Sequence, residues 1–269
     1  MKSLKGILTI TSCTILSILV LGLSLTYTVK SFVIKEVAPS TIKELLRKEY
    51  VKTNQLDSHK LEVLDRVFYD KNTSATIEII IDNFLEYKDN KSAYKVKEKD
   101  LKKVREFMVE HKKDLSDFSN EELTDEKIIE HFQVDVINDE VIDIFEKVDK
   151  DLNKTEKLVL NVYSKATSSS TRNIMIATMI ILAIAIVLLN LPITQSFGKL
   201  GVSILISGIL LAFVYVALLI LKDKIISSLK IDLDLNSINF NIFLIWSIIE
   251  IALGTSLIVI KRLTNKKAE

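Results

Sequence analysis

A single carboxylic acid, Glu250, interrupts the apolar stretch IWSIIEIALGTSLIVI at residues 245–260. Among hydrocarbon side chains, a carboxyl group can hold a proton or a cation, or accept hydrogen bonds from neighbouring helices. An ionised carboxylate facing lipid at the middle of a bilayer costs at least about 2.5 kcal/mol. We therefore expect Glu250 to face other helices, to be protonated or to line water.

Small and polar residues are spaced so that they accompany Glu250 on helical faces. At 100° per residue, Phe243, Ser247 and Gly254 share its face. Two earlier apolar stretches carry similar faces, one of Gly201, Gly208, Ala212 and Tyr215, the other of Thr9, Cys13, Ser17, Ser24 and Thr28. Small residues let membrane helices approach closely. We expect Ser17, Ser207 or Tyr215 to hydrogen-bond Glu250, with Ser17 at the same depth. The candidate intramembrane polar site is Glu250, Ser247, Gly254, Ser17 and Tyr215.

Three interpretations of Glu250 stay open, of which the third is a tolerated residue without a role. In the first, it is a neutral acid that joins helices, or it pairs with a basic residue of a partner membrane protein. In the second, it is a proton or cation site. The apolar stretches contain no Lys, Arg or His, so the chain offers no salt bridge at that depth.

The elements that position Glu250 are four nearly uncharged runs, residues 6–29, 174–193, 200–221 and 240–260. A helix of about 20 residues spans a hydrocarbon core of about 30 Å. The sequence therefore predicts four transmembrane helices. A cleaved signal peptide is the alternative for the first run, because Lys2 and Lys5 precede it. Its length, and the absence of an A-x-A-like site after it, favour a retained anchor.

Lysine and arginine near the helix ends predict the orientation. One side collects seven, at positions 2, 5, 199, 261, 262, 266 and 267, and the other collects three, at 222, 224 and 230. We expect a plasma membrane protein with both termini in the cytoplasm and residues 30–172 outside. The predicted divisions are 1–29 (cytoplasmic start and first span), 30–172 (outer domain), 173–193 (second span), 194–199 (cytoplasmic loop), 200–221 (third span), 222–239 (outer loop), 240–260 (fourth span) and 261–269 (basic tail).

The sequence of the segment 30–172 predicts helices. It contains no glycine and one proline, Pro39, whereas sheet proteins rely on glycine-rich turns. Apolar residues recur at helical spacing within 42–50, 61–68, 77–85 and 101–108, and from 137 to 166 without interruption. The only expected break before the second span is the SSST stretch at 168–171. The predicted fold class is all-α, a four-span transmembrane bundle with an all-helical extracytoplasmic domain between spans one and two.

Charge is unevenly spread in this segment. Residues 91–113 carry nine basic and four acidic side chains, whereas 114–151 carry fourteen acidic and three basic. These are solvated faces of neighbouring helices that attract one another or, alternatively, an acidic surface for cations or a basic partner. We expect no nucleic acid partner, because the segment as a whole is net acidic, with 26 basic and 30 acidic residues. Cys13 is the only cysteine, so this segment has no internal disulfide.

No pattern of catalytic or metal-binding residues stands out. Asp149, Asp151 and Asn153 begin a calcium-loop pattern, but Lys154 stands where glycine is needed and Leu160 where glutamate is needed. None of the three histidines has a second histidine at i+3 or i+4. We expect no enzyme activity, no cofactor and no metal.

The layout resembles that of FtsX-type and MacB-type mechanotransmission subunits of ABC transport systems, with one long outer segment followed by three closely spaced spans. The resemblance covers topology only, and the loop 194–199 is short for an ATPase-coupling helix. It implies a transport-linked subunit, which is the alternative function. The expected function is that of a non-enzymatic envelope interaction or assembly protein, bacterial by its Lys, Ile and Asn bias, whose outer domain binds a partner. Its oligomeric state is left open.

Overall fold

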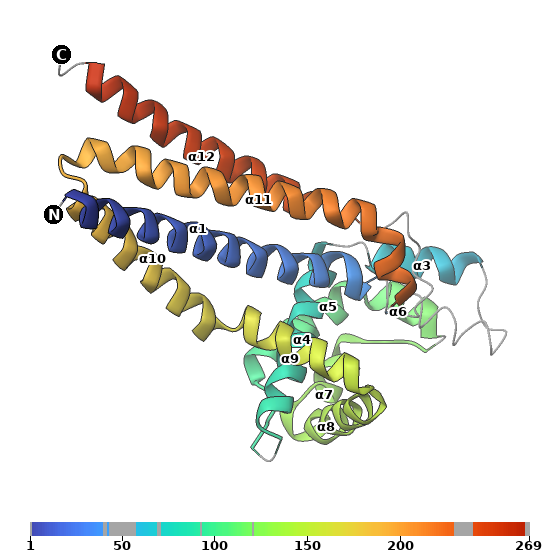
Figure 1. Ribbon diagram of the computed structural model, residues 1–269. Coiled ribbons are helices and arrows are strands. Elements are labelled where there is room, and N and C mark those ends of the chain that lie inside the picture. Colours follow the sequence, from blue (N-terminus) through green and yellow to red (C-terminus); the bar gives the residue numbers. More distant parts are fainter. Residues whose placement is uncertain are drawn as a thin grey trace. The chain divides into compact units, whose positions relative to one another are not determined.

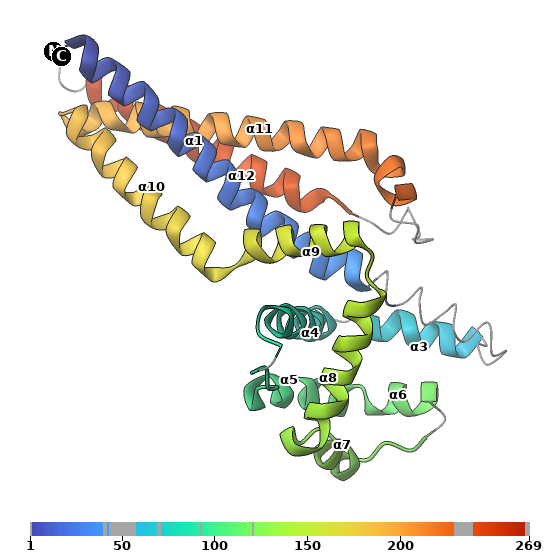
Figure 2. The ribbon, with the colours of Figure 1, turned by 60° about the horizontal axis from the view of Figure 1, so that its bottom comes forward.

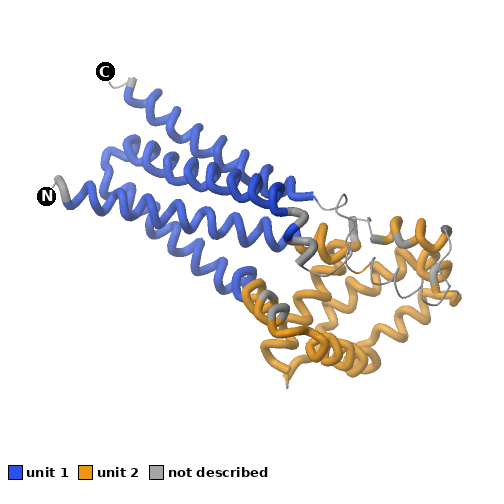
Figure 3. The backbone as a smooth tube through the Cα atoms, turned by 45° about the vertical axis from the view of Figure 1, so that its right-hand side comes forward, with its two compact units in different colours: residues 1–32, 165–230, 239–269 blue, residues 33–164, 231–238 orange. Residues whose placement is uncertain are grey.

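The computed structural model describes residues 2–39, 42, 58–68, 71–91, 93–119, 121–228 and 239–266, and this described part is all-helical, as predicted. The predicted helix at 42–50 lies outside it, apart from residue 42. The chain forms two compact units (Figure 3). Unit 1 comprises residues 1–32, 165–230 and 239–269, and unit 2 comprises 33–164 and 231–238.

Unit 1 contains four long helices, α1 (Lys2–Phe32), α10 (Ser169–Leu189), α11 (Ile193–Ser228) and α12 (Asn241–Lys266) (Figure 1). All four are long and apolar enough to cross a membrane, which indicates a membrane-spanning protein. The turn between α10 and α11 differs from the prediction, because residues 194–199 are helical and the turn lies at residues 190–192. Pro192 explains the shift, since it disfavours a helical conformation at the residue before it and fits before a helix start. Helix α11 also extends into the predicted loop 222–239, whose residues 229–238 lie outside the description.

Helices α11 and α12 lie side by side with their backbones in contact. A Cβ atom added at Gly254 would lie 2.6 Å from the backbone nitrogen of Leu205, and one added at Gly208 would lie 2.9 Å from the backbone nitrogen of Ile251. Such an approach leaves no room for a side chain at either position. Helix α1 packs against α10, α11 and α12.

Unit 2 consists of shorter helices (Figure 2). They are the π-helix η1 (Val33–Val37), α3 (Ser58–Phe68), α4 (Lys71–Asp89), α5 (Glu98–Glu110), α6 (Lys112–Ser119), α7 (Asp125–His131), α8 (Val134–Asp151) and α9 (Lys154–Thr167). Its core is apolar and largely aromatic, formed by Tyr87, Tyr94, Val96, Leu101, Ile137 and Phe145. The ring of Phe145 lies 5.7 Å from Tyr87 and 5.3 Å from Phe84, between centroids, in tilted and edge-on arrangements that suit aromatic pairs.

The prediction of one uninterrupted helix from 137 to 166 is wrong at residue 152. Leu152 adopts an extended backbone (φ −65°, ψ 127°) and ends α8. The carbonyl of Asn153 then accepts the first hydrogen bond of α9, from the amide of Lys157 at 3.0 Å. Asparagine is a favoured residue at a helix start, so it separates the two helices. The expected break at 168–171 is confirmed, because Ser168 accepts a hydrogen bond from the amide of Thr171 and begins α10.

Candidate functional site

Glu250 lies in the interior of unit 1, as predicted, with only 4% of its surface exposed. The hydroxyl of Ser24 on α1 donates a hydrogen bond to carboxyl oxygen Oε1. The hydroxyl of Ser207 on α11 donates to Oε2 at 2.5 Å. Both oxygens therefore have a hydroxyl donor, and the carboxyl group of α12 connects three helices.

The two glycine contacts frame this carboxyl group. Ser247, one turn before Glu250, donates a hydrogen bond to the carbonyl of Gly208 at 2.8 Å. A Cβ atom at Gly208 would lie 2.9 Å from the Cβ of Glu250. Gly254, one turn after Glu250, packs against the backbone of Leu205. Close packing thus excludes lipid from both sides of Glu250.

The predicted partners of Glu250 are confirmed only in part. Ser207 is a partner, but Ser17 and Tyr215 are not. Ser17 donates instead to the carbonyl of Cys13 in its own helix at 3.0 Å. Ser24 takes its place, seven residues or about 10 Å further along α1. Both serines belong to the predicted stripe, and the axial offset between α1 and α12 decides which one reaches Glu250.

The chemistry available at this site is hydrogen bonding and oxygen ligation. Carboxyl and hydroxyl oxygens are also ligands of hard cations. Within the described ranges, however, no group of three or more His, Cys, Asp or Glu residues is arranged to hold a metal ion. The two hydrogen bonds from Ser24 and Ser207 fit an interhelical connector.

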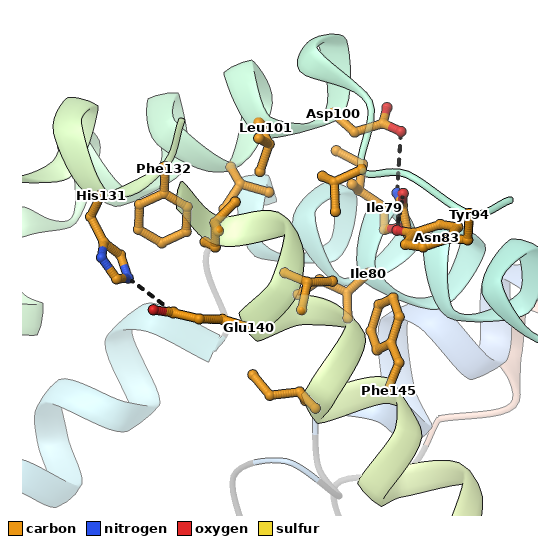
Figure 4. Close-up of a pocket in the computed structure, with 15 residues that line it drawn as sticks. Ile79, Ile80, Asn83, Tyr94, Asp100, Leu101, His131, Phe132, Glu140 and Phe145 are labelled. Atoms are coloured by element: carbon orange, nitrogen blue, oxygen red, sulfur yellow. Dashed lines mark hydrogen bonds and ion pairs between the residues drawn. The ribbon is translucent and has the colours of Figure 1, made fainter. Parts of the chain in front are cut away.

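A second candidate site is a half-open cavity of about 410 Å³ in unit 2 (Figure 4). Its walls come from α4, α5, α7 and α8 and from the residues just before α5 and just after α7. They are mainly apolar, formed by Ile79, Ile80, Val96, Leu101, Val104, Phe132, Ile137, Val141, Ile144 and Phe145. The size is typical of small-ligand sites, whose walls are likewise mostly apolar. Ile80 and Ile144 line it and are 47% and 56% exposed, so they border its opening.

Polar groups lie at the two ends of the cavity. Figure 4 shows His131 and Glu140 at one end, with Nε2 and Oε2 3.6 Å apart. At the other end, Tyr94 donates a hydrogen bond to Asn83 at 2.8 Å, and the Asn83 amide donates to Asp100 at 3.2 Å. Burial raises the pKa of Tyr94 to about 12, so its hydroxyl keeps its proton and stays a donor at neutral pH.

The sequence revealed the apolar stripes that line this cavity but not the cavity itself. Leu101 and Val104 lie on one predicted stripe, and Ile137, Val141, Ile144 and Phe145 on another. A stripe shows only which face of a helix avoids water. Whether two facing stripes fill the space between them depends on helix separation, for which the sequence carries no local signal.

Comparison with known proteins identifies no relative. The chain matches no protein-family model, no curated protein and no solved structure.

Proposed function

We propose that this chain is a non-enzymatic, multi-pass membrane protein that binds a partner through the helices of unit 2, while the bundle of unit 1 anchors it. The observation that carries the proposal is the apolar cavity bordered by half-exposed Ile80 and Ile144. Exposed apolar surface is unfavourable in water and typically marks a binding site. An apolar lining supplies binding free energy by removing partner surface from water.

Binding is favoured over catalysis by the state of the polar groups in the cavity. Glu140 lies against His131, and Asp100 accepts a hydrogen bond from Asn83. The polar side chains are thus engaged with one another at opposite ends. A hydrolase would instead need its acid, base or nucleophile to converge on one reacting atom.

The proposed orientation has both termini in the cytoplasm and residues 30–172 outside a bacterial plasma membrane. The bias of seven basic residues against three near the helix ends supports it. It would place the cavity of unit 2 in the envelope, where an envelope protein can reach it. Modification of single cysteines introduced at Lys113 and Lys261 by a membrane-impermeant thiol reagent tests this, with labelling of intact cells expected only at the first.

Photocrosslinking in native membranes tests the binding function. A photoreactive residue at Ile144, on the cavity mouth, is expected to give one defined crosslinked partner. The control is Val136, which is 46% exposed on the same helix but lies about 110° around it from the lining face. Equal patterns at the two positions, or crosslinks only within the chain, would remove the basis for a partner at this cavity.

A transport-linked role at Glu250 is the second candidate. It is favoured by one observation, that a buried carboxyl group lies among hydroxyl groups from two other helices within the apolar spans. Glu250→Gln keeps the size of the side chain and abolishes its charge. In reconstituted vesicles, a proton or cation flux that this variant removes would support the role, whereas unchanged flux would count against it.

A further inference from the structure

The apolar surface at the mouth of the unit 2 cavity continues beyond the cavity. Val148 lies one turn after Ile144 on the same face of α8, and it is 42% exposed. It does not line the cavity. A molecule that filled only the cavity would leave this surface in water. The extent of the exposed surface therefore fits an occupant longer than the cavity.

The volume of the cavity indicates the size of the group that can occupy it. A cavity of about 150 Å³ accommodates a benzene ring. The 410 Å³ here thus has room for more than one large apolar side chain. Residues spaced by three or four positions on a helix project from one face and enter such a site together. An amphipathic segment of a polypeptide meets both requirements.

The charged groups of the lining set the sign of the partner. They are the carboxylates of Asp100 and Glu140 and the imidazole of His131, which lies against Glu140. Lys99 and Lys102 of α5 do not change this balance, because they lie about 150° around the helix from the lining face. Residues 114–151, which include α7 and α8, carry fourteen acidic and three basic side chains.

We infer that the cavity of unit 2 receives the apolar face of a partner polypeptide segment flanked by lysine or arginine. The inference rests on the proposed partner-binding function and specifies its chemistry. Apolar side chains enter between α4 and α8, and basic residues meet Glu140 and Asp100 at the two ends. A fatty acid or phospholipid fits less well, since its anionic head group would lie beside one of these carboxylates.

Peptide binding to the full-length chain tests this inference. The chain is reconstituted in nanodiscs of zwitterionic phosphatidylcholine, which does not itself attract basic peptides. Three fluorescent amphipathic peptides share the same leucines at i, i+3, i+4 and i+7 and carry Lys, Gln or Glu at the flanks. By anisotropy, the Lys peptide is expected to bind about tenfold more tightly than the Glu peptide, with the Gln peptide between them.

Substitutions test whether the peptides bind at the cavity. Ile144→Asp, at a half-exposed position, is expected to weaken the Lys peptide at least about tenfold, because it puts a charge into the apolar contact. Val162→Asp, at a position of α9 that is 61% exposed and does not line the cavity, is the control and is expected to leave binding unchanged. Glu140→Gln is expected to reduce the preference for the Lys peptide over the Glu peptide about threefold.

Three results of the binding measurements would overturn the inference. In the first, the Lys and Glu peptides bind with equal affinity and both lose binding in Ile144→Asp. The cavity would then bind peptides but without the proposed preference for basic ones. Binding insensitive to Ile144→Asp would place the peptide elsewhere. A separate measurement uses an apolar fluorescent dye bound in the cavity. If decanoate displaces the dye and no peptide does, the cavity binds lipid chains. The crosslink from Ile144 is read separately, so a crosslinked partner without a basic segment would refute the inference and keep the proposed function.

Discussion

Among the described residues, unit 1 buries mainly polar side chains and unit 2 mainly apolar ones. Unit 1 buries serines and a glutamate, among them Ser24, Ser207 and Glu250, and exposes isoleucines and leucines on α10 and α11. Unit 2 buries aromatic and aliphatic residues such as Tyr87, Ile137 and Phe145, and exposes charged ones. The difference follows from the solvent, because lipid removes the advantage of burying apolar side chains and leaves packing and hydrogen bonds to hold helices together.

The comparison shows where each unit has room. In unit 1, the glycines of α11 and α12 bring two backbones into contact around Glu250. In unit 2, large side chains meet around a cavity of about 410 Å³. Substitutions that enlarge a side chain at these positions should therefore destabilise unit 1 and be tolerated in unit 2. This contrast is why we place ligand binding in unit 2 and helix association in unit 1.

The largest effect is expected from Gly254→Val. Its Cβ would lie 2.6 Å from the nitrogen of Leu205 and 2.7 Å from the carbonyl oxygen of Gly201, and backbone atoms cannot move aside like a flexible side chain. We expect the free energy of unfolding of unit 1 to fall by about 3 kcal/mol. Denaturant titration in micelles, followed through Trp246, measures it. Gly6→Val is the control, because a Cβ there meets nothing within 4 Å. Similar losses in the two variants would contradict the close packing.

The next effect is expected from removal of the carboxyl group. Glu250→Ala deletes both interhelical hydrogen bonds and leaves the hydroxyls of Ser24 and Ser207 without their acceptor. We expect a loss of about 2 kcal/mol, since such bonds in membranes contribute about 0.6 to 1.7 kcal/mol each. Glu250→Gln, which keeps hydrogen-bonding capacity, should lose less than half as much. The same titration measures both, and Ser24→Ala combined with Glu250→Ala should cost no more than Glu250→Ala alone.

A gain in stability is expected from filling the cavity of unit 2. Val141→Phe adds volume to a residue that lines it, and we expect unit 2 to be stabilised by about 0.5 to 1 kcal/mol. Slower hydrogen exchange of the amides in α5 and α8 would show this, with Val136→Phe as an exposed control. Val141→Phe should also weaken crosslinking from Ile144, because it fills space that the partner would occupy. Faster exchange would mean that the larger side chain destabilises unit 2 and does not fit the cavity.

The smallest effect is expected from the ion pair of Lys91 and Asp149, whose Nζ and Oδ2 atoms lie 2.5 Å apart. Hydrogen bonding lowers the pKa of Asp149 from its ordinary 3.8 and raises that of Lys91 from 10.5. The contribution of Asp149 is present above pH 3.8 and is lost as the pH falls through its lowered pKa. That of Lys91 is present below pH 10.5 and is lost as the pH rises through its raised pKa.

Because the Lys91 side chain is 53% exposed, solvent screens this pair. Asp149→Asn should therefore cost only about 0.5 kcal/mol at neutral pH. Hydrogen exchange of the α8 amides at pH 7 measures the cost. A loss of stability comparable to that of Glu250→Ala would show that unit 2, too, depends on polar contacts, and would contradict the difference between the units.

Most helices, and the faces they bury, could be predicted from the amino-acid sequence. Periodicity and the absence of glycine from 30–172 predicted helices in unit 2, and uncharged length predicted four apolar helices. The cost of a charge in lipid predicted that Glu250 lies inside. All of these depend on a residue and its near neighbours in the same helix, so a local pattern is sufficient.

Contacts between residues of different helices could not be predicted in this way, because they depend on how whole helices pack. Ser24 rather than Ser17 contacts Glu250, because the offset of α1 along α12 arises from the packing of whole helices. The helix break at Leu152 also escaped prediction, since apolar spacing continued across it and Asn153 overrode the pattern. The cavity needs four helices held at a given separation, and the gap between apolar faces is fixed by tertiary packing rather than by any single stretch of sequence.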